Sequence, residues 1–180
     1  LMSLRGLAGF YTDFLWFDSL GQGDVFKAVF GAQVVLVLLF MFLFFLIFFG
    51  NLTIAQRLAP RIRPAGPEED LLVHYHTFVG KRDRLLRILF SLFCAFIAGL
   101  RVSDKWQDWL LFTNRVDVGV SDAQFEKDIG FYIFQLPFYN FVVDWVFGTL
   151  LITLIFTAIT HYLNGGIRFQ TTGERVSPQV

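Results

Sequence analysis

The chain has 180 residues, of which 55% are hydrophobic and 24 are phenylalanine, and its formal net charge is zero. This composition excludes an ordinary soluble domain, and the balance of fifteen basic and fifteen acidic residues indicates no nucleic-acid partner. Cys94 is the only cysteine, so no disulfide can form within this chain.

Residues 1–28 carry many aromatic side chains, among them Phe10, Tyr11 and Trp16, interspersed with carboxylates such as Asp13. Rings beside carboxylates suit the headgroup layer of a bilayer. We predict an extracytoplasmic interfacial segment, with a docking surface for a partner as the alternative. Because the chain starts with Leu1 and lacks a signal-peptide pattern, we also expect it to be part of a longer protein.

The segment 29–50 predicts the first transmembrane helix. From Phe30 to Phe49 it has no charge and one polar side chain, Gln33. Twenty helical residues rise ~30 Å, which matches the hydrocarbon core of a bilayer. The apolar side chains favour insertion by about 5 to 10 kcal/mol. Gly50 and Asn51 are expected to mark the far end of this helix.

Residues 51–84 predict a cytoplasmic loop. Three prolines between residues 57 and 67 exclude a continuous helix there, and an amphipathic helix is expected over 67–80. His74 and His76 form an H-x-H pair. Two residues apart on a helix they point in different directions, with no third ligand nearby, so we predict exposed histidines and no metal site.

Residues 85–103 predict the second transmembrane helix. Only the thirteen residues from Ile88 to Leu100 are uncharged, but Arg87 and Arg101 can extend their charges to the two interfaces. Small residues recur every four positions on one face, which favours close packing against another helix. These helix-packing candidates are Ser91, Ala95 and Gly99.

Residues 104–136 predict an extracytoplasmic loop with two interfacial helices. Asp104 with Gln107, and Ser121 with Gln124, resemble capping boxes at the starts of these helices. The many carboxylates of this loop could bind calcium or perform acid–base chemistry, but their spacing matches no EF-hand loop. We interpret them as a solvated surface with helix caps.

Residues 137–163 predict the third transmembrane helix, with Trp145 and Tyr162 as interface anchors. A stripe of small and hydroxyl side chains either lines a polar path or bonds to neighbouring helices and to the helix's own carbonyls. Its members are Gly148, Thr149, Thr153 and Thr157. Asp144 is the possible functional polar residue, since carboxylates near a span are rare, although its position indicates the headgroup level.

The distribution of charge predicts the orientation. The loop between the first two helices, with the margin of the second, holds seven lysines and arginines, and the loop between the last two holds three. Basic residues mark the cytoplasmic side. We therefore expect the N-terminus outside and the tail, residues 164–180, in the cytoplasm. An external N-terminus also implies a preceding span.

The chain resembles the large bacterial membrane proteins of uncharacterised protein family 0182. The matching stretches are FYTDFLWFDSLGQGDVF (10 to 26), KWQDWLLFTNR (105 to 115) and DIGFYIFQLPFYNF (128 to 141). The resemblance implies an N-terminal membrane part of a protein with further spans and a large extracytoplasmic region. The chain departs from the family pattern at Val118 and Ala123, and the resemblance transfers no catalytic residue.

Together these features predict an all-α integral membrane protein with three transmembrane helices and interfacial amphipathic helices, a fragment of a larger helical bundle in the bacterial cell membrane. The sequence indicates no catalytic, cofactor or metal site. We expect a non-enzymatic structural or assembly subunit whose partners are lipids and other transmembrane helices of the same longer protein or of a complex. The alternatives are a transport or export component, and a membrane enzyme acting on lipid or envelope substrates.

Overall fold

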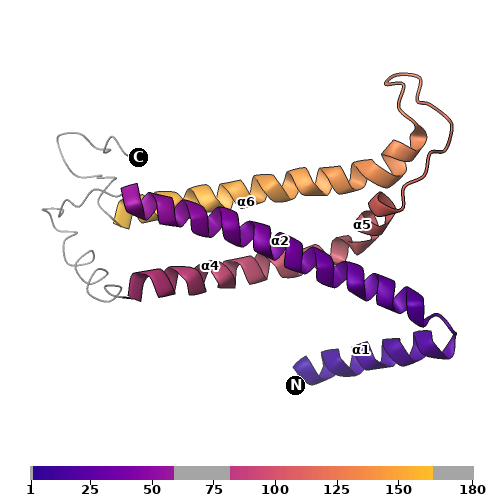
Figure 1. Cartoon of the computed structure of the whole chain (residues 1–180), viewed down its shortest axis with the longest axis horizontal. Helices are drawn as coiled ribbons and strands as arrows, with labels where there is room; N and C mark the ends of the chain where they lie inside the picture. The colour runs from indigo at the N-terminus through magenta and orange to yellow at the C-terminus, as the bar shows by residue number, and fades with distance from the viewer. Residues whose placement is uncertain (1, 59–81, 164–180) are drawn as a thin grey trace, which may run out of the picture. The chain divides into compact units, whose positions relative to one another are not determined.

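A computed structural model describes residues 2–58 and 82–163, and these are almost entirely helical (Figure 1). The elements in chain order are α1 (Met2–Ser19), α2 (Gly23–Leu58), α4 (Asp83–Leu100), the 3-10 helix η2 (Arg101–Lys105), α5 (Trp106–Thr113), the π-helical turn η3 (Phe131–Gln135) and α6 (Leu136–Leu163). Three helical stretches are long and apolar enough to cross a membrane: Gly23–Leu58, Asp83–Thr113 and Phe131–Leu163. The predicted all-α membrane fold is confirmed.

The described residues divide into two compact units. The first unit holds α1, α2 up to Leu39, and the chain from Leu100 to Tyr139. The second unit holds α2 from Phe40 onward, α4 up to Gly99, and α6 from Asn140 onward. Each unit has its own packing.

In the first unit, the aromatic N-terminal segment folds into α1 and turns back along α2. Gly21 adopts a φ of 71°, which a residue with a side chain rarely tolerates. The N–H of Gln22 donates to the carbonyl of Phe17, and the N–H of Gly21 donates to that of Asp18, both at 2.9 Å. This is the Schellman arrangement that ends a helix. The turn brings Phe10 and Phe14 of α1 against Phe26 of α2.

Helix α2 continues beyond its expected end, so the prediction that Gly50 and Asn51 stop it is wrong. The side-chain amide of Asn51 donates to the carbonyl of Ile47, at 2.8 Å, within the helix. Further along, Leu52 and Ala55 are buried. Burial of the last turns outweighs the weak helix propensities of glycine and asparagine, which cost ~1 kcal/mol or less per residue.

In the second unit, α2, α4 and α6 pack around a phenylalanine-rich core. The rings of Phe48, Phe90 and Phe156, one from each helix, contact one another with centroids 5.3 to 6.0 Å apart. Helix α4 meets this core through its small face, where Ser91, Ala95 and Gly99 are buried. Aromatic contacts of this kind add roughly 0.5 to 1.5 kcal/mol per pair beyond area burial.

Helix α6 is continuous with the π-helical turn η3, and Pro137 lies just after the junction. The N–H of Leu136 bonds to the carbonyl of Phe131, five residues earlier. A wider π turn immediately before proline accommodates its ring and its missing N–H. Trp145 then packs edge-on against Phe40, at 4.8 Å between ring centroids. This tryptophan therefore contributes to the helix core, and its role as an interface anchor stays a prediction.

The segment between α5 and η3 differs from its prediction. Helix α5 forms, but its N-cap is Lys105, which makes no side-chain capping bond, so the capping box expected at Asp104 is wrong. The second interfacial helix, expected after Ser121, is also wrong. The chain instead makes a turn closed by an isolated antiparallel bridge between Ser121 and Asp128.

Candidate functional site

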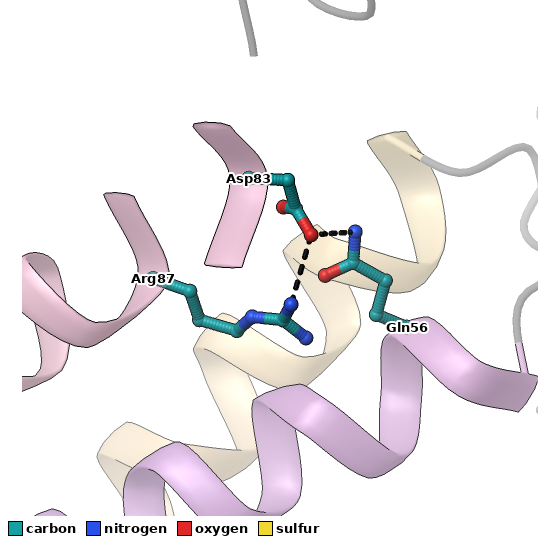
Figure 2. Close-up of polar contacts among 3 residues, drawn as sticks. All are labelled: Gln56, Asp83 and Arg87. Atoms are coloured by element: carbon teal, nitrogen blue, oxygen red, sulfur yellow. Dashed lines mark hydrogen bonds and ion pairs between the residues drawn. The ribbon is translucent and has the colours of Figure 1, made fainter. Parts of the chain in front are cut away.

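The clearest polar constellation in the second unit joins the last turn of α2 to the first turn of α4. The Asp83 carboxylate receives two hydrogen bonds on the same oxygen, Oδ2 (Figure 2). Gln56 donates through Nε2 at 2.6 Å, and Arg87 donates through Nη2 at 2.8 Å. Asp83 and Arg87 lie one helical turn apart, which is the spacing at which side chains on a helix meet.

This pair is substantially shielded from the surroundings. The Arg87 side chain is 14% exposed and the Asp83 side chain 26% exposed. The guanidinium reaches toward the start of α4 and meets a carboxylate there. Its placement at a membrane interface stays a prediction. Asp83 also occupies the first turn of α4, where the helix dipole favours a negative charge. Chemically, the arrangement neutralises a charge near the end of a span and links two helices.

A second feature is a groove of about 470 Å³ between α2 and α6. Asn51 of α2 lies on one side, and the exposed side chains of Leu150 and Leu154 lie on the α6 side. Thr153 and Thr157 also line it, and their hydroxyl oxygens are buried without a hydrogen-bond partner among the described residues. A transmembrane helix with a hydrogen-bonding side chain, or a lipid chain, fits such a surface.

The other candidate residues of α6 differ in their exposure. Thr149 is buried, Gly148 is half-buried, and Asp144 is exposed. Asp144 precedes Thr149 by five positions, which places it about 140° around the helix from Thr149. Asp144 and the hydroxyl stripe therefore lie on different faces of α6, and the structure does not bring them together.

Other buried polar atoms also lack a partner within the described part of the chain. They belong to Ser91, His161, Thr53 and the Nε atom of Arg87. Thr160, in contrast, donates its hydroxyl to the carbonyl of Phe156 at 2.8 Å. This is a bond to a carbonyl of the same helix, four residues earlier, as threonines in helices commonly make. Residues 2–58 and 82–163 contain no group of three or more metal-binding side chains. His74 and His76, with the amphipathic helix predicted over 67–80, lie outside the described residues.

The loop before η3, in the first unit, is held together by one carboxylate. Asp128 accepts backbone N–H bonds from Val118, Gly119 and Gly130, at 3.0, 2.8 and 2.6 Å. These donors, with that of Val118 the strongest, lower the pKa of Asp128 below its ordinary value despite partial desolvation. Asp122 similarly receives the N–H of Phe125 at 2.9 Å. These two carboxylates therefore have structural partners within the loop.

Sequence reasoning missed the Gln56–Asp83–Arg87 contact and the role of Asp128. The i, i+4 spacing of Asp83 and Arg87 could have predicted the ion pair, because oppositely charged side chains at this spacing on a helix attract each other. Gln56 is 27 positions from Asp83, and no local pattern connects them. Asp128 is followed two positions later by Gly130, a pattern typical of a turn.

Comparison with known proteins gives a consistent result along the whole chain. The chain matches the Uncharacterised protein family (UPF0182) over residues 1–180. It is 39% identical to a UPF0182 protein of a Nocardioides species over 98% of the chain, and 33% identical to one of Streptomyces coelicolor, also over 98%. A UPF0182 protein of Frankia casuarinae is 36% identical over 93% of the chain.

The chain spans only a small part of these relatives, namely 18%, 18% and 16% of their respective lengths. No solved structure matches the chain. The match over all 180 residues and the identity to several bacterial relatives agree with the resemblance seen in the motifs. The chain belongs to the Uncharacterised protein family (UPF0182).

Proposed function

We propose that this chain is a structural membrane module that supplies a packing surface for further transmembrane helices of a longer protein or of a membrane complex. The observation that carries the proposal is the groove between α2 and α6. It combines exposed leucines with the amide of Asn51 and the buried hydroxyls of Thr153 and Thr157. Polar side chains in hydrocarbon are costly unless they are hydrogen-bonded. The Thr153 and Thr157 hydroxyls have no partner among the described residues, and a neighbouring helix can supply one.

The surface available for such packing is large. In the most apolar stretch of the third span, Phe131–Leu163, only 11% is buried. In that of the second span, Asp83–Thr113, 22% is buried. The relatives are several times longer than this chain, which supplies candidate helices to cover these faces. The three helices already bury small residues and rings against one another, so their own packing can support a larger bundle.

An enzymatic role has less support. A catalytic site needs several polar groups converging in one cleft. Within the described residues, two carboxylates of the loop before η3, those of Asp122 and Asp128, accept N–H bonds from the loop backbone, and Asp83 is paired with Arg87. These groups are already engaged in maintaining structure.

Transport is the second candidate, because the hydroxyls of Thr153 and Thr157 border the groove. A polar path needs charged and hydroxyl groups to face one another or water. Asp144 lies on another face of α6, about 140° from Thr149. This arrangement disfavours a polar path that uses both the Asp144 carboxylate and the threonine hydroxyls. The packing role is therefore the better supported function.

We further propose that the protein is a multi-pass protein of the bacterial cell membrane, with its N-terminus outside and its C-terminus in the cytoplasm. The bacterial relatives and the three membrane-length helices support the location. The excess of arginine and lysine between residues 57 and 87 supports the orientation.

The replacement Asn51→Leu tests the packing role, with Ile54→Leu as the matched control on an exposed position of the same helix. If the groove holds a helix, Asn51→Leu removes the amide oxygen and N–H that the helix contacts, and we expect lower thermal stability of the intact protein in mild detergent. Where the helix belongs to another subunit, we also expect a lower apparent mass of the complex. If the groove faces lipid, the same change favours the membrane by a few kcal/mol at most and leaves the complex unchanged. Thermal stability and apparent mass that both match those of Ile54→Leu would contradict the proposal.

A second pair of variants tests the small face of α4. Gly99 is buried and Asp144 is exposed. We expect Gly99→Leu to disrupt assembly and Asp144→Asn to preserve it, since only the first introduces bulk at a helix contact. Equal assembly of the two variants would count against a scaffold.

A further inference from the structure

The hairpin of α1 and α2, in the first unit, contains a small pocket of about 190 Å³ that the packing role does not use. Four phenylalanine rings, the side chain of Val29 and two polar side chains line it. The rings are those of Phe10, Phe17, Phe26 and Phe30, and the polar side chains are Asp13 and Gln33. This volume is well below the ~300 to 1,000 Å³ of pockets for drug-sized ligands, so only a small chemical group fits.

Helical periodicity explains why these side chains converge. Phe10, Asp13 and Phe17 are at positions i, i+3 and i+7 of α1, which lie on one face. Phe26, Phe30 and Gln33 repeat this spacing with i, i+4 and i+7 on α2. The turn at Gly21 brings the two faces together, and the Phe10 ring lies 5.3 Å from that of Phe26 and 5.0 Å from that of Phe30.

The pocket offers negative charge and negative ring faces, and no positive group. Within the described residues, Asp13 has no ion-pair partner, whereas Asp24 is paired with Lys27 at 3.1 Å. Aromatic faces carry a negative quadrupole that attracts cations. The amide of Gln33 adds a carbonyl oxygen as a further acceptor. A small organic cation with alkyl substituents neutralises the charge of the Asp13 carboxylate and contacts the rings at the same time.

We propose that this pocket binds the ammonium group of an organic cation, with the Asp13 carboxylate neutralising its charge and the phenylalanines enclosing its alkyl substituents. Aromatic pockets with a nearby carboxylate suit quaternary and primary ammonium groups, which are less strongly hydrated than metal ions. The ammonium can belong to a lipid headgroup or to a free alkylammonium compound, and the chemistry of the pocket is the same for both.

Choline tests the proposal, in saturation-transfer NMR on the intact protein in phosphatidylglycerol nanodiscs, whose lipid carries no ammonium group. Its methyl protons should receive saturation from the aromatic protons of the protein. We expect Asp13→Asn and Phe30→Leu each to weaken choline binding roughly fivefold or more, which is the size of one cation–π or charge contact. Asp18→Asn is the matched control, an exposed carboxylate on the same helix that does not line the pocket, and should change binding less than twofold.

The neutral isostere 3,3-dimethylbutan-1-ol separates charge from shape. Equal binding of this alcohol and of choline would overturn the proposal, as would unchanged choline binding in Asp13→Asn. Because Asp13 is exposed, that variant keeps the test valid even if Phe30→Leu fails to fold. Nanodiscs containing phosphatidylethanolamine should compete with choline if a headgroup occupies the pocket, and phosphatidylglycerol nanodiscs should not. Choline binding without such competition assigns the pocket to a free cation.

Discussion

The contact among Gln56, Asp83 and Arg87 makes the sharpest energetic prediction. Replacing Asp83 with alanine removes both hydrogen bonds on its Oδ2 atom and leaves the Arg87 guanidinium, 14% exposed, without a counter-charge. Breaking a buried ion pair costs ~3 to 5 kcal/mol. Because Asp83 itself is about one quarter exposed, we expect a loss at the lower limit, about 3 kcal/mol of unfolding free energy, or roughly a hundredfold in the folding equilibrium.

A double-mutant cycle isolates the interaction. Arg87→Met preserves the aliphatic packing and removes the charge, and it should cost less than Asp83→Ala because Asp83 keeps its bond from Gln56. The double variant Asp83→Ala with Arg87→Met should be less destabilised than the sum of the single variants, by at least ~1 kcal/mol of coupling energy. Unfolding by sodium dodecyl sulfate in mixed micelles, followed by circular dichroism, measures each value.

The pair between Asp24 and Lys27 is the matched control. Its distance is similar, 3.1 Å, but its side chains are 72% exposed for Lys27 and 99% for Asp24. Exposed pairs contribute only ~0.2 to 1 kcal/mol. The cycle for Asp24→Ala with Lys27→Met should therefore give a coupling energy near the lower value. Coupling energies of equal size in the two cycles would refute the reasoning from burial.

Further predictions concern the loop before η3. Since the folded-state pKa of Asp128 is lowered, mainly by the N–H of Val118, its contribution to stability is constant above pH ~4 and is lost as the pH falls through the lowered value. The amide NMR signal of Gly119, which donates to Asp128, should be unchanged between pH 5 and 8 and should shift only as the pH falls through the lowered pKa. Trypsin cleavage at Lys127, measured at pH 7, should be severalfold faster in Asp128→Asn; equal rates in the variant and the parent would contradict this. Gly130→Ala should also loosen the loop, because its Cβ would lie 2.5 Å from the carbonyl oxygen of Val116. Gly148→Ala, where nothing lies within 4 Å of the new Cβ, is the control and should leave thermal stability unchanged or slightly raised.

The sequence was sufficient to predict the all-α fold and the three membrane-length helices, because long uncharged runs have few alternatives in water or lipid. It failed where local signals compete with tertiary contacts. Gly50 and Asn51 read as a helix end, but burial of Leu52 and Ala55 continues α2. Such burial depends on the neighbouring helices, which local propensity does not describe.

The loop before η3 shows a different limit. Ser121 with Gln124 matched a helix-start pattern, yet the Asp122 carboxylate accepts the N–H of Phe125 and forms a local turn. Side chains such as aspartate compete with helix formation in this way. The contact of Gln56 with Asp83 is a tertiary contact between residues 27 positions apart. The pocket at Asp13 forms only because the hairpin turn brings two helix faces together. Neither is visible as a local motif.

The proposed crossing of the membrane is tested most directly by the accessibility of two engineered cysteines, Arg82→Cys and Asp117→Cys, each in a Cys94→Ala background. Both positions are exposed in the structure. On intact cells, a membrane-impermeant maleimide should label residue 117 at once and residue 82 only after the membrane is permeabilised. Labelling of residue 82 from the exterior, or equal labelling of both positions on intact cells, would contradict the account.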